Sequence, residues 1–102
     1  MDRPACACAP EVFSTVYRLC VRLSRKTRFV PYLCAIHTPD AERAVQKLLP
    51  VLRGGEVLSA MDANLVYVLL LAEYEEQALF AQEQIACALP FADLRLQCVR
   101  AE

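Results

Sequence analysis

Glycine and histidine are scarce in this chain, and their scarcity excludes several kinds of site. The 102 residues include only two glycines, Gly54 and Gly55, so no P-loop or glycine-rich dinucleotide-binding loop can form. The single histidine, His37, excludes any catalytic or metal scheme that needs two imidazoles. These absences exclude those kinds of site only; for the whole chain we expect a protein that is not an enzyme, with no catalytic residues, no metal site and no cofactor.

Positive and negative charges are nearly balanced in this chain. The net charge is −1, so no overall field favours nucleic acid or an anionic membrane. Basic residues cluster from Arg18 to Arg28, where they complement the dipole at the end of a helix. No apolar run approaches the roughly 18 residues of a membrane-spanning helix, and residues 1–10 lack the pattern of a signal peptide. We predict a cytoplasmic protein with no nucleic-acid partner and no membrane insertion.

Cysteine is abundant by contrast, with six residues in a short chain. Cys6 and Cys8 form an isolated Cys-x-Cys, without a second ligand pair at zinc spacing. The other four lie in apolar, periodic segments, where reduced cysteine packs as a small hydrophobe; they are Cys20, Cys34, Cys87 and Cys98. We expect six free thiols, four of them in the core.

Hydrophobic residues make up 57% of the chain, which predicts a packed core. The length predicts one domain over residues 1–102, with residues 1–9 flexible. Periodicity predicts helices over 10–27, 38–52 and 75–89, and strands over 29–36, 57–61, 65–71 and 94–98. This order of helices and strands predicts an α/β (α+β) fold. The fold is a ferredoxin-like βαββαβ antiparallel sheet preceded by an N-terminal helix.

Within these elements, local signals predict caps and buried faces. Thr38 is expected to cap the second helix with Pro39 at its first position, and Gly54-Gly55 to end it. Strands 29–36 and 65–71 are apolar throughout, as expected of central strands. Because helices 38–52 and 75–89 can cover only one face, the leading helix or a second copy must cover the other. The apolar stripe of that leading helix comprises Val12, Phe13, Val16, Tyr17, Cys20 and Leu23.

A leading helix that ends in basic residues, followed by this order of elements, resembles the GGDEF domain of diguanylate cyclases. Active members read roughly L-R-x-x-D-x-x-x-R-x-G-G-D-E-F-x-x-L-L, followed by an acidic, alanine-rich helix. Residues 52–70 align with this pattern without a gap, and helix 75–89 falls where the family places its own. The resemblance implies a GGDEF-like fold and a bacterial signalling role.

The signature loop of the family is degenerate in this chain. At the matching positions stand Asp62, Ala63, Asn64, Leu65 and Val66. The first of these replaces a glycine, and the last two carry no oxygen ligand. The family's metal-binding Asp falls near Ile36 or His37. Phosphoryl transfer needs hard oxygen ligands to hold Mg²⁺, so the resemblance implies a catalytically inactive domain, as in regulators of exopolysaccharide secretion.

The family's secondary, inhibitory nucleotide site, an Arg-x-x-Asp before the second strand, is matched in position by Arg53 and Glu56. An Arg fork can hold a phosphate or a guanine edge, and a carboxylate can accept from guanine N–H groups. The resemblance thus implies a regulatory or scaffolding module that binds cyclic di-GMP. Alternatively Arg53 complements a helix dipole, Glu56 starts an exposed strand, and the chain is a ferredoxin-like domain for a protein partner or a homodimer, with no nucleotide.

Overall fold

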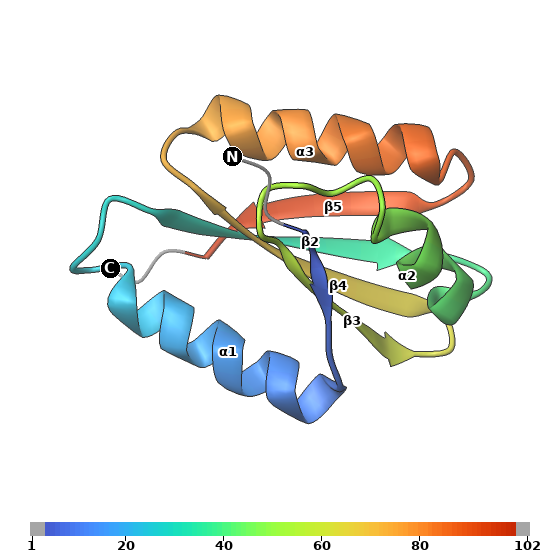
Figure 1. The fold of residues 1–102 in the computed structure, drawn as a ribbon, viewed down its shortest axis with the longest axis horizontal. Helices are drawn as coiled ribbons and strands as arrows, with labels where there is room; N and C mark the ends of the chain where they lie inside the picture. The colour runs from blue at the N-terminus through green and yellow to red at the C-terminus, as the bar shows by residue number, and fades with distance from the viewer. Residues whose placement is uncertain (1–3, 100–102) are drawn as a thin grey trace.

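The computed structural model describes residues 4–99. They form a mixed α+β fold with three helices and a five-stranded sheet in the order β1-β3-β4-β2-β5 (Figure 1). The elements are β1 (Cys6–Ala7), α1 (Pro10–Leu23), β2 (Val30–His37), α2 (Ala41–Leu48), β3 (Val57–Asp62), β4 (Leu65–Ala72), α3 (Glu75–Ala88) and β5 (Asp93–Cys98).

The two apolar strands, β2 and β4, each have a neighbour on both sides, as predicted for central strands. The pairs β2–β4, β2–β5 and β3–β4 are antiparallel, whereas β1 runs parallel to β3. No sequence signal marked β1, which lies in the stretch expected to be flexible. Two backbone hydrogen bonds hold β1 in place: Cys6 N–H donates to Glu56 O at 2.9 Å, and Cys8 N–H donates to Leu58 O at 3.0 Å.

The face of the sheet under α2 and α3 carries the main core. The predicted stripes of these two helices are buried throughout, which confirms them; they comprise Ala41, Val45, Leu48, Leu52, Ala78, Ala81, Ile85 and Leu89. They meet the buried side chains Cys34, Ile36, Leu58, Val66, Val68 and Leu70 of the strands. Alternation along each strand then directs the intervening residues to the other face.

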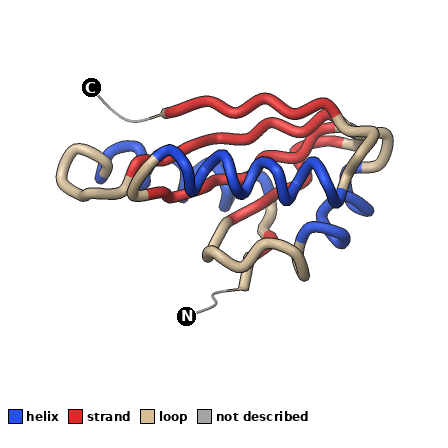
Figure 2. Tube along the Cα trace, turned by 90° about the horizontal axis from the view of Figure 1, so that it is seen from above, coloured by secondary structure: helices blue, strands red, loops and turns tan. Residues whose placement is uncertain are grey.

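Helix α1 packs on that other face, opposite α3 (Figures 1 and 2). Its contacts are mainly with β3, and the ring centroid of Phe13 lies 6.0 Å from that of Tyr67. The expectation that this helix packs on the second face is therefore confirmed, although the helix covers that face mainly along β3. The predicted stripe is only partly right, however, because Phe13 is buried while Val12 and Leu23 are exposed. The helix contacts mainly the β3 side of the sheet, and part of its stripe remains exposed.

Two helices are shorter than predicted. Helix α1 ends at Leu23, and Ser24 caps it: its N–H donates to Cys20 O, and its Oγ donates to Val21 O at 2.6 Å. Helix α2 is capped by Asp40, whose Oδ1 accepts from Arg43 N–H at 3.2 Å. The prediction of Thr38 as its cap was wrong, as was that of Pro39 at the first helical position.

At its other end, α2 stops at Leu48, two residues before Pro50, which lacks an N–H and whose ring crowds the preceding turn. Gly54-Gly55 consequently lies in the loop between α2 and β3 and is not a helix stop.

All six cysteines are free thiols, as predicted. Only Cys34 is fully buried, and burial raises the pKa of its thiol to about 11. The prediction of four core cysteines was wrong for Cys87 and Cys98, which are exposed, and Cys20 is half-buried. Cys87 lies off the buried stripe of α3, and Cys98 ends the edge strand β5.

Candidate functional site

The β3–β4 hairpin, where the resemblance places a signature loop, has its polar side chains engaged in local structure. Asp62 Oδ1 accepts from Asn64 N–H at 2.8 Å. Asn64 Nδ2 donates to Thr38 O at 3.1 Å and to Pro39 O at 3.0 Å. Two backbone hydrogen bonds join the same segments. Thr38 N–H donates to Asn64 O at 3.0 Å, and Ala41 N–H donates to Ala63 O at 2.9 Å. The hairpin therefore ties the β2–α2 connection to the sheet.

His37 is exposed at the end of β2, next to Asp93 on β5. Across residues 4–99, no group of three or more His, Cys, Asp or Glu side chains could hold a metal ion. Among the described helices none is long and apolar enough to cross a membrane.

Arg53 and Glu56, the two predicted ligand residues, line one groove of about 620 Å³ beside α3. Arg53 is exposed, whereas Glu56 is only 8% exposed and precedes β3. The alternative interpretation, in which Glu56 begins an exposed strand, is therefore wrong. Within the described part of the chain no ion pair joins the two side chains. Instead Glu56 Oε1 accepts from Gly54 N–H at 2.8 Å.

The two glycines of the chain make this turn possible. Gly55 has φ 78°, in the left-handed region that glycine adopts at little cost. A Cβ on Gly54 would lie 2.8 Å from Glu56 Oε2, so the carboxylate fits against the backbone only because Gly54 has no side chain. The Gly-Gly pair thus folds the loop back and holds the Glu56 carboxylate at the groove.

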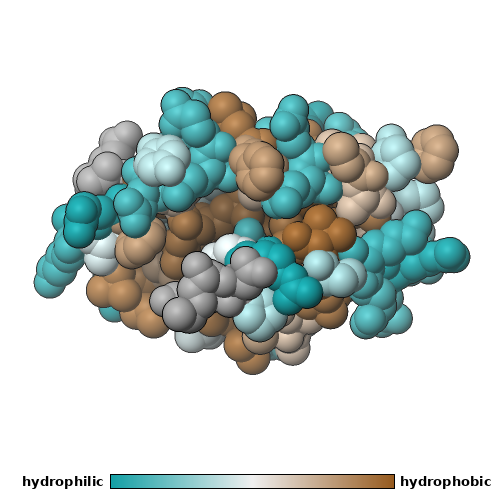
Figure 3. All heavy atoms as spheres, turned by 45° about the horizontal axis from the view of Figure 1, so that its top comes forward, coloured by the Kyte–Doolittle hydropathy of each residue, from teal (hydrophilic) through white to brown (hydrophobic). Residues whose placement is uncertain are grey.

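The groove walls are largely apolar. Phe29 precedes β2, Leu71 lies near the end of β4, and Phe80 projects from α3; their exposed fractions are 45%, 48% and 62%. Gln77, Gln84 and Glu73 add polar groups at the rim. On this side of the molecule, apolar side chains gather in a hollow bordered by hydrophilic ones (Figure 3). The arrangement offers flat rings, one guanidinium and two carboxylates to a ligand.

Sequence reasoning missed the aromatic walls of this groove. Phe80 lies off the buried stripe of α3, between Leu79 and Ala81. A large aromatic residue on the outer side of a predicted helix was the available signal. Nothing in the local sequence indicates that Phe29 lies near it, because that proximity comes from the β2–β4 pairing, in which Val30 faces Ala72.

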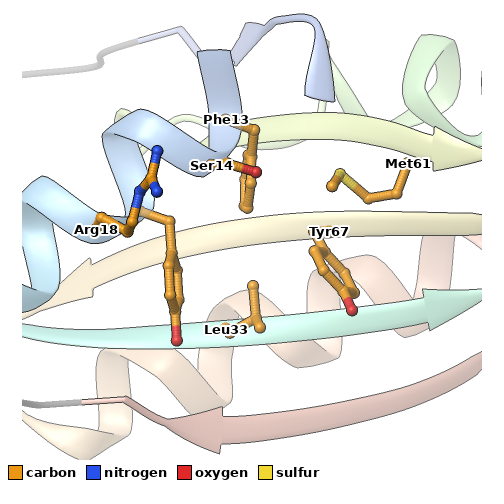
Figure 4. Close-up of a pocket in the computed structure, with 7 residues that line it drawn as sticks. Phe13, Ser14, Arg18, Leu33, Met61 and Tyr67 are labelled. Atoms are coloured by element: carbon orange, nitrogen blue, oxygen red, sulfur yellow. The ribbon is translucent and has the colours of Figure 1, made fainter. Parts of the chain in front are cut away.

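A second hollow, of about 310 Å³, lies between α1 and the sheet. Phe13 points from α1 toward the sheet, Met61 reaches in from β3, and Arg18 turns its guanidinium away (Figure 4). Tyr67 and Leu33 form part of its floor. This hollow contains none of the predicted site residues and shares no residue with the groove at Arg53.

Comparison of the chain with protein-family models, with curated proteins and with solved structures finds no match. The resemblance to the GGDEF domain consequently rests on the sequence pattern alone.

Proposed function

We propose that this chain is a non-catalytic binding module of regulatory or scaffolding type, whose ligand site is the groove beside Arg53 and Glu56. The observation that carries the proposal is the groove itself, which brings the two predicted residues to one apolar-walled surface. The hairpin supports the absence of catalysis, because Asp62 and Asn64 hold the fold by hydrogen bonds. A cytoplasmic setting is part of the proposal, and the six free thiols support it.

We further propose that β2 to β5 form a ferredoxin-like, GGDEF-like unit with β1 added at its edge. The order β3-β4-β2-β5, with antiparallel neighbours, supports this arrangement. The packing of α2 and α3 on one face supports it as well.

Cyclic di-GMP is the ligand proposed for the groove, on the strength of the sequence resemblance. Arg53 is free to approach a phosphate or a guanine edge, and Glu56 Oε2 can accept from guanine N–H groups. The rings of Phe29 and Phe80 offer stacking surfaces for the bases, a contact that contributes about 1–3 kcal/mol per base. The groove is large enough to admit part of such a ligand.

Calorimetric titration of the protein with cyclic di-GMP tests this proposal. We expect micromolar binding, weakened in Arg53→Ala by about 1.5–3 kcal/mol, the contribution of a charge-assisted hydrogen bond. Arg43→Ala, an exposed arginine that lines a different hollow, is the matched control and should bind as the parent does. No binding, or equal binding by Arg53→Ala, would refute the site. The parent incubated with GTP and Mg²⁺ should make no cyclic di-GMP.

The charges of the groove favour a second candidate, a protein-interaction domain without a nucleotide. The carboxylates of Glu56 and Glu73 outnumber the guanidinium of Arg53, which disfavours a dianion. Exposed Phe29, Leu71 and Phe80 suit an apolar segment with a basic residue. A protein that fails to bind the nucleotide but binds such a peptide, and loses the peptide in Phe80→Ser, would support this candidate.

A further inference from the structure

Strand β5 leaves one edge of the sheet open. It pairs with β2 from Asp93 to Cys98, and within residues 4–99 no strand pairs with its other side. Figure 2 shows it as the outermost strand, with no described segment beyond it. The strand has no proline and no bulge, which are common means of blocking an edge. An open edge of this kind offers backbone hydrogen bonds to another strand.

The hydrogen-bond pattern of the β2–β5 pair fixes which groups face outward. Val99 N–H donates to Pro31 O at 2.9 Å, so Val99 directs its backbone groups toward β2. Successive residues of a strand alternate in this direction. Arg95 and Gln97 therefore also face β2, whereas Leu94 and Leu96 present their N–H and C=O groups to the open edge.

We propose that this edge pairs, antiparallel, with the same edge of a second copy of the chain. In the register that places Leu94 opposite the partner's Leu94, the two residues exchange backbone hydrogen bonds. Leu96 N–H then faces the C=O of the partner's Ala92. In the same register Asp93 faces the partner's Arg95, and the two-fold axis repeats this opposite-charge pair.

Other registers lose this complementarity. A shift of the register by one pair places Arg95 opposite the partner's Arg95, and a shift the other way places Asp93 opposite the partner's Asp93. Like charges directly opposite each other destabilise a sheet. Both side chains are exposed and lie on the same face of the strand, so they are available for the cross-strand pairs. The register with two Asp–Arg pairs is therefore the one to which the proposal commits.

The same two-fold axis places the α3 helices of both copies on one side of the joined sheet. The groove residues Gln77, Phe80 and Gln84 lie on one flank of α3. Helical spacing places Leu79 and Ala86 on the opposite flank, and both are exposed. An apolar and a small side chain on that flank allow the two helices to approach.

Sedimentation velocity on the full chain and on two charge-reversed variants tests the proposal. The parent should be a dimer, and Arg95→Asp and Asp93→Arg should each be monomeric, because each places like charges opposite one another. An equimolar mixture of the two variants should form a heterodimer, since all facing charges are then opposite. The double variant carrying both substitutions should dimerise with itself.

A monomeric parent would overturn the proposal, and so would single variants that remain dimeric. Recovery of the dimer on mixing cannot arise from misfolded variants, so it separates loss of the interface from loss of the fold. The proposal goes beyond the ligand groove and does not depend on it. Arg95→Asp should therefore keep the parent's behaviour toward cyclic di-GMP, whatever that behaviour is, and the two proposals can fail separately.

Discussion

The two faces of the sheet differ in how completely they are covered. Under α2 and α3 the side chains of Cys34, Ile36 and Val68 have no exposed surface. Under α1, Leu69 is buried together with Phe13 of the helix, but Leu33 and Tyr67 are only half-buried. A hollow also remains between α1 and the sheet, with Leu33 and Tyr67 in its floor. The first face is a closed core, whereas the second is covered mainly along β3.

This difference shows that an apolar stripe does not by itself set how deeply a helix is buried. Helix α1 has a long stripe but buries only Phe13. Helix α3 has apolar residues over much of its surface, including exposed Leu79 and Phe80, and still buries Ala78, Ala81 and Ile85. The position of each helix over the sheet decides the outcome, because burial requires partner atoms on the facing surface.

Removal of residues 1–27 tests the comparison most severely. The deletion takes away α1 and β1, uncovers Leu69 and the floor of the hollow, and frees the edge of β3. Burial of one Leu or Val side chain contributes about 1.5–3 kcal/mol, so several such contributions are lost together. We expect insoluble or molten protein, measured by size-exclusion chromatography, dye binding and near-UV circular dichroism. A truncated chain that stays soluble, monomeric and cooperatively folded would show that the second face needs no cover.

The closed face was the more predictable of the two from sequence. The stripes of α2 and α3 and the central strands follow from local periodicity, and all of these residues pack against one continuous core. Strand β1 depends instead on tertiary contacts. The pairing of β1 needs Glu56 O and Leu58 O, which lie some fifty residues away along the chain and leave no local pattern.

The candidate site, like the fold, was predictable from the sequence only in part. Sequence pattern selected Arg53 and Glu56, and the structure places both beside one groove. The inward turn of the Glu56 carboxylate was missed, because it depends on a contact with Gly54 N–H that only the folded loop brings about. The aromatic walls were missed because Phe29 and Phe80 meet only through the assembled sheet and helix.

Truncation of Phe13 tests the covered part of the α1 face without removing the helix. We expect Phe13→Ala to destabilise the protein by about 3 kcal/mol, the lower end for a buried Phe, because the adjacent hollow lets the site relax. Val12→Ala, the exposed neighbour on the same helix, should change the free energy of unfolding by less than about 0.5 kcal/mol. Urea denaturation measures both variants. Equal effects would show that α1 contacts the sheet in another way.

The smallest expected effect concerns a single hydroxyl on the α1 face. Ser59 is 1% exposed, lies opposite Tyr67 across the β3–β4 pair, and its Oγ has no hydrogen-bond partner among residues 4–99. An unpaired buried hydroxyl costs about 1–3 kcal/mol. Ser59→Ala removes that cost at nearly constant volume, so we expect the free energy of unfolding to rise by about 1 kcal/mol.

Ser24→Ala is the matched control for this substitution. Ser24 is equally buried, but its Oγ donates to Val21 O at 2.6 Å, so its removal should destabilise the protein by about 1 kcal/mol. Opposite signs for the two variants in urea denaturation would distinguish a bonded hydroxyl from an unbonded one. If Ser59→Ala is instead destabilising, the hydroxyl is paired in solution. The α1 face would then hold a polar partner for Ser59, such as an ordered water.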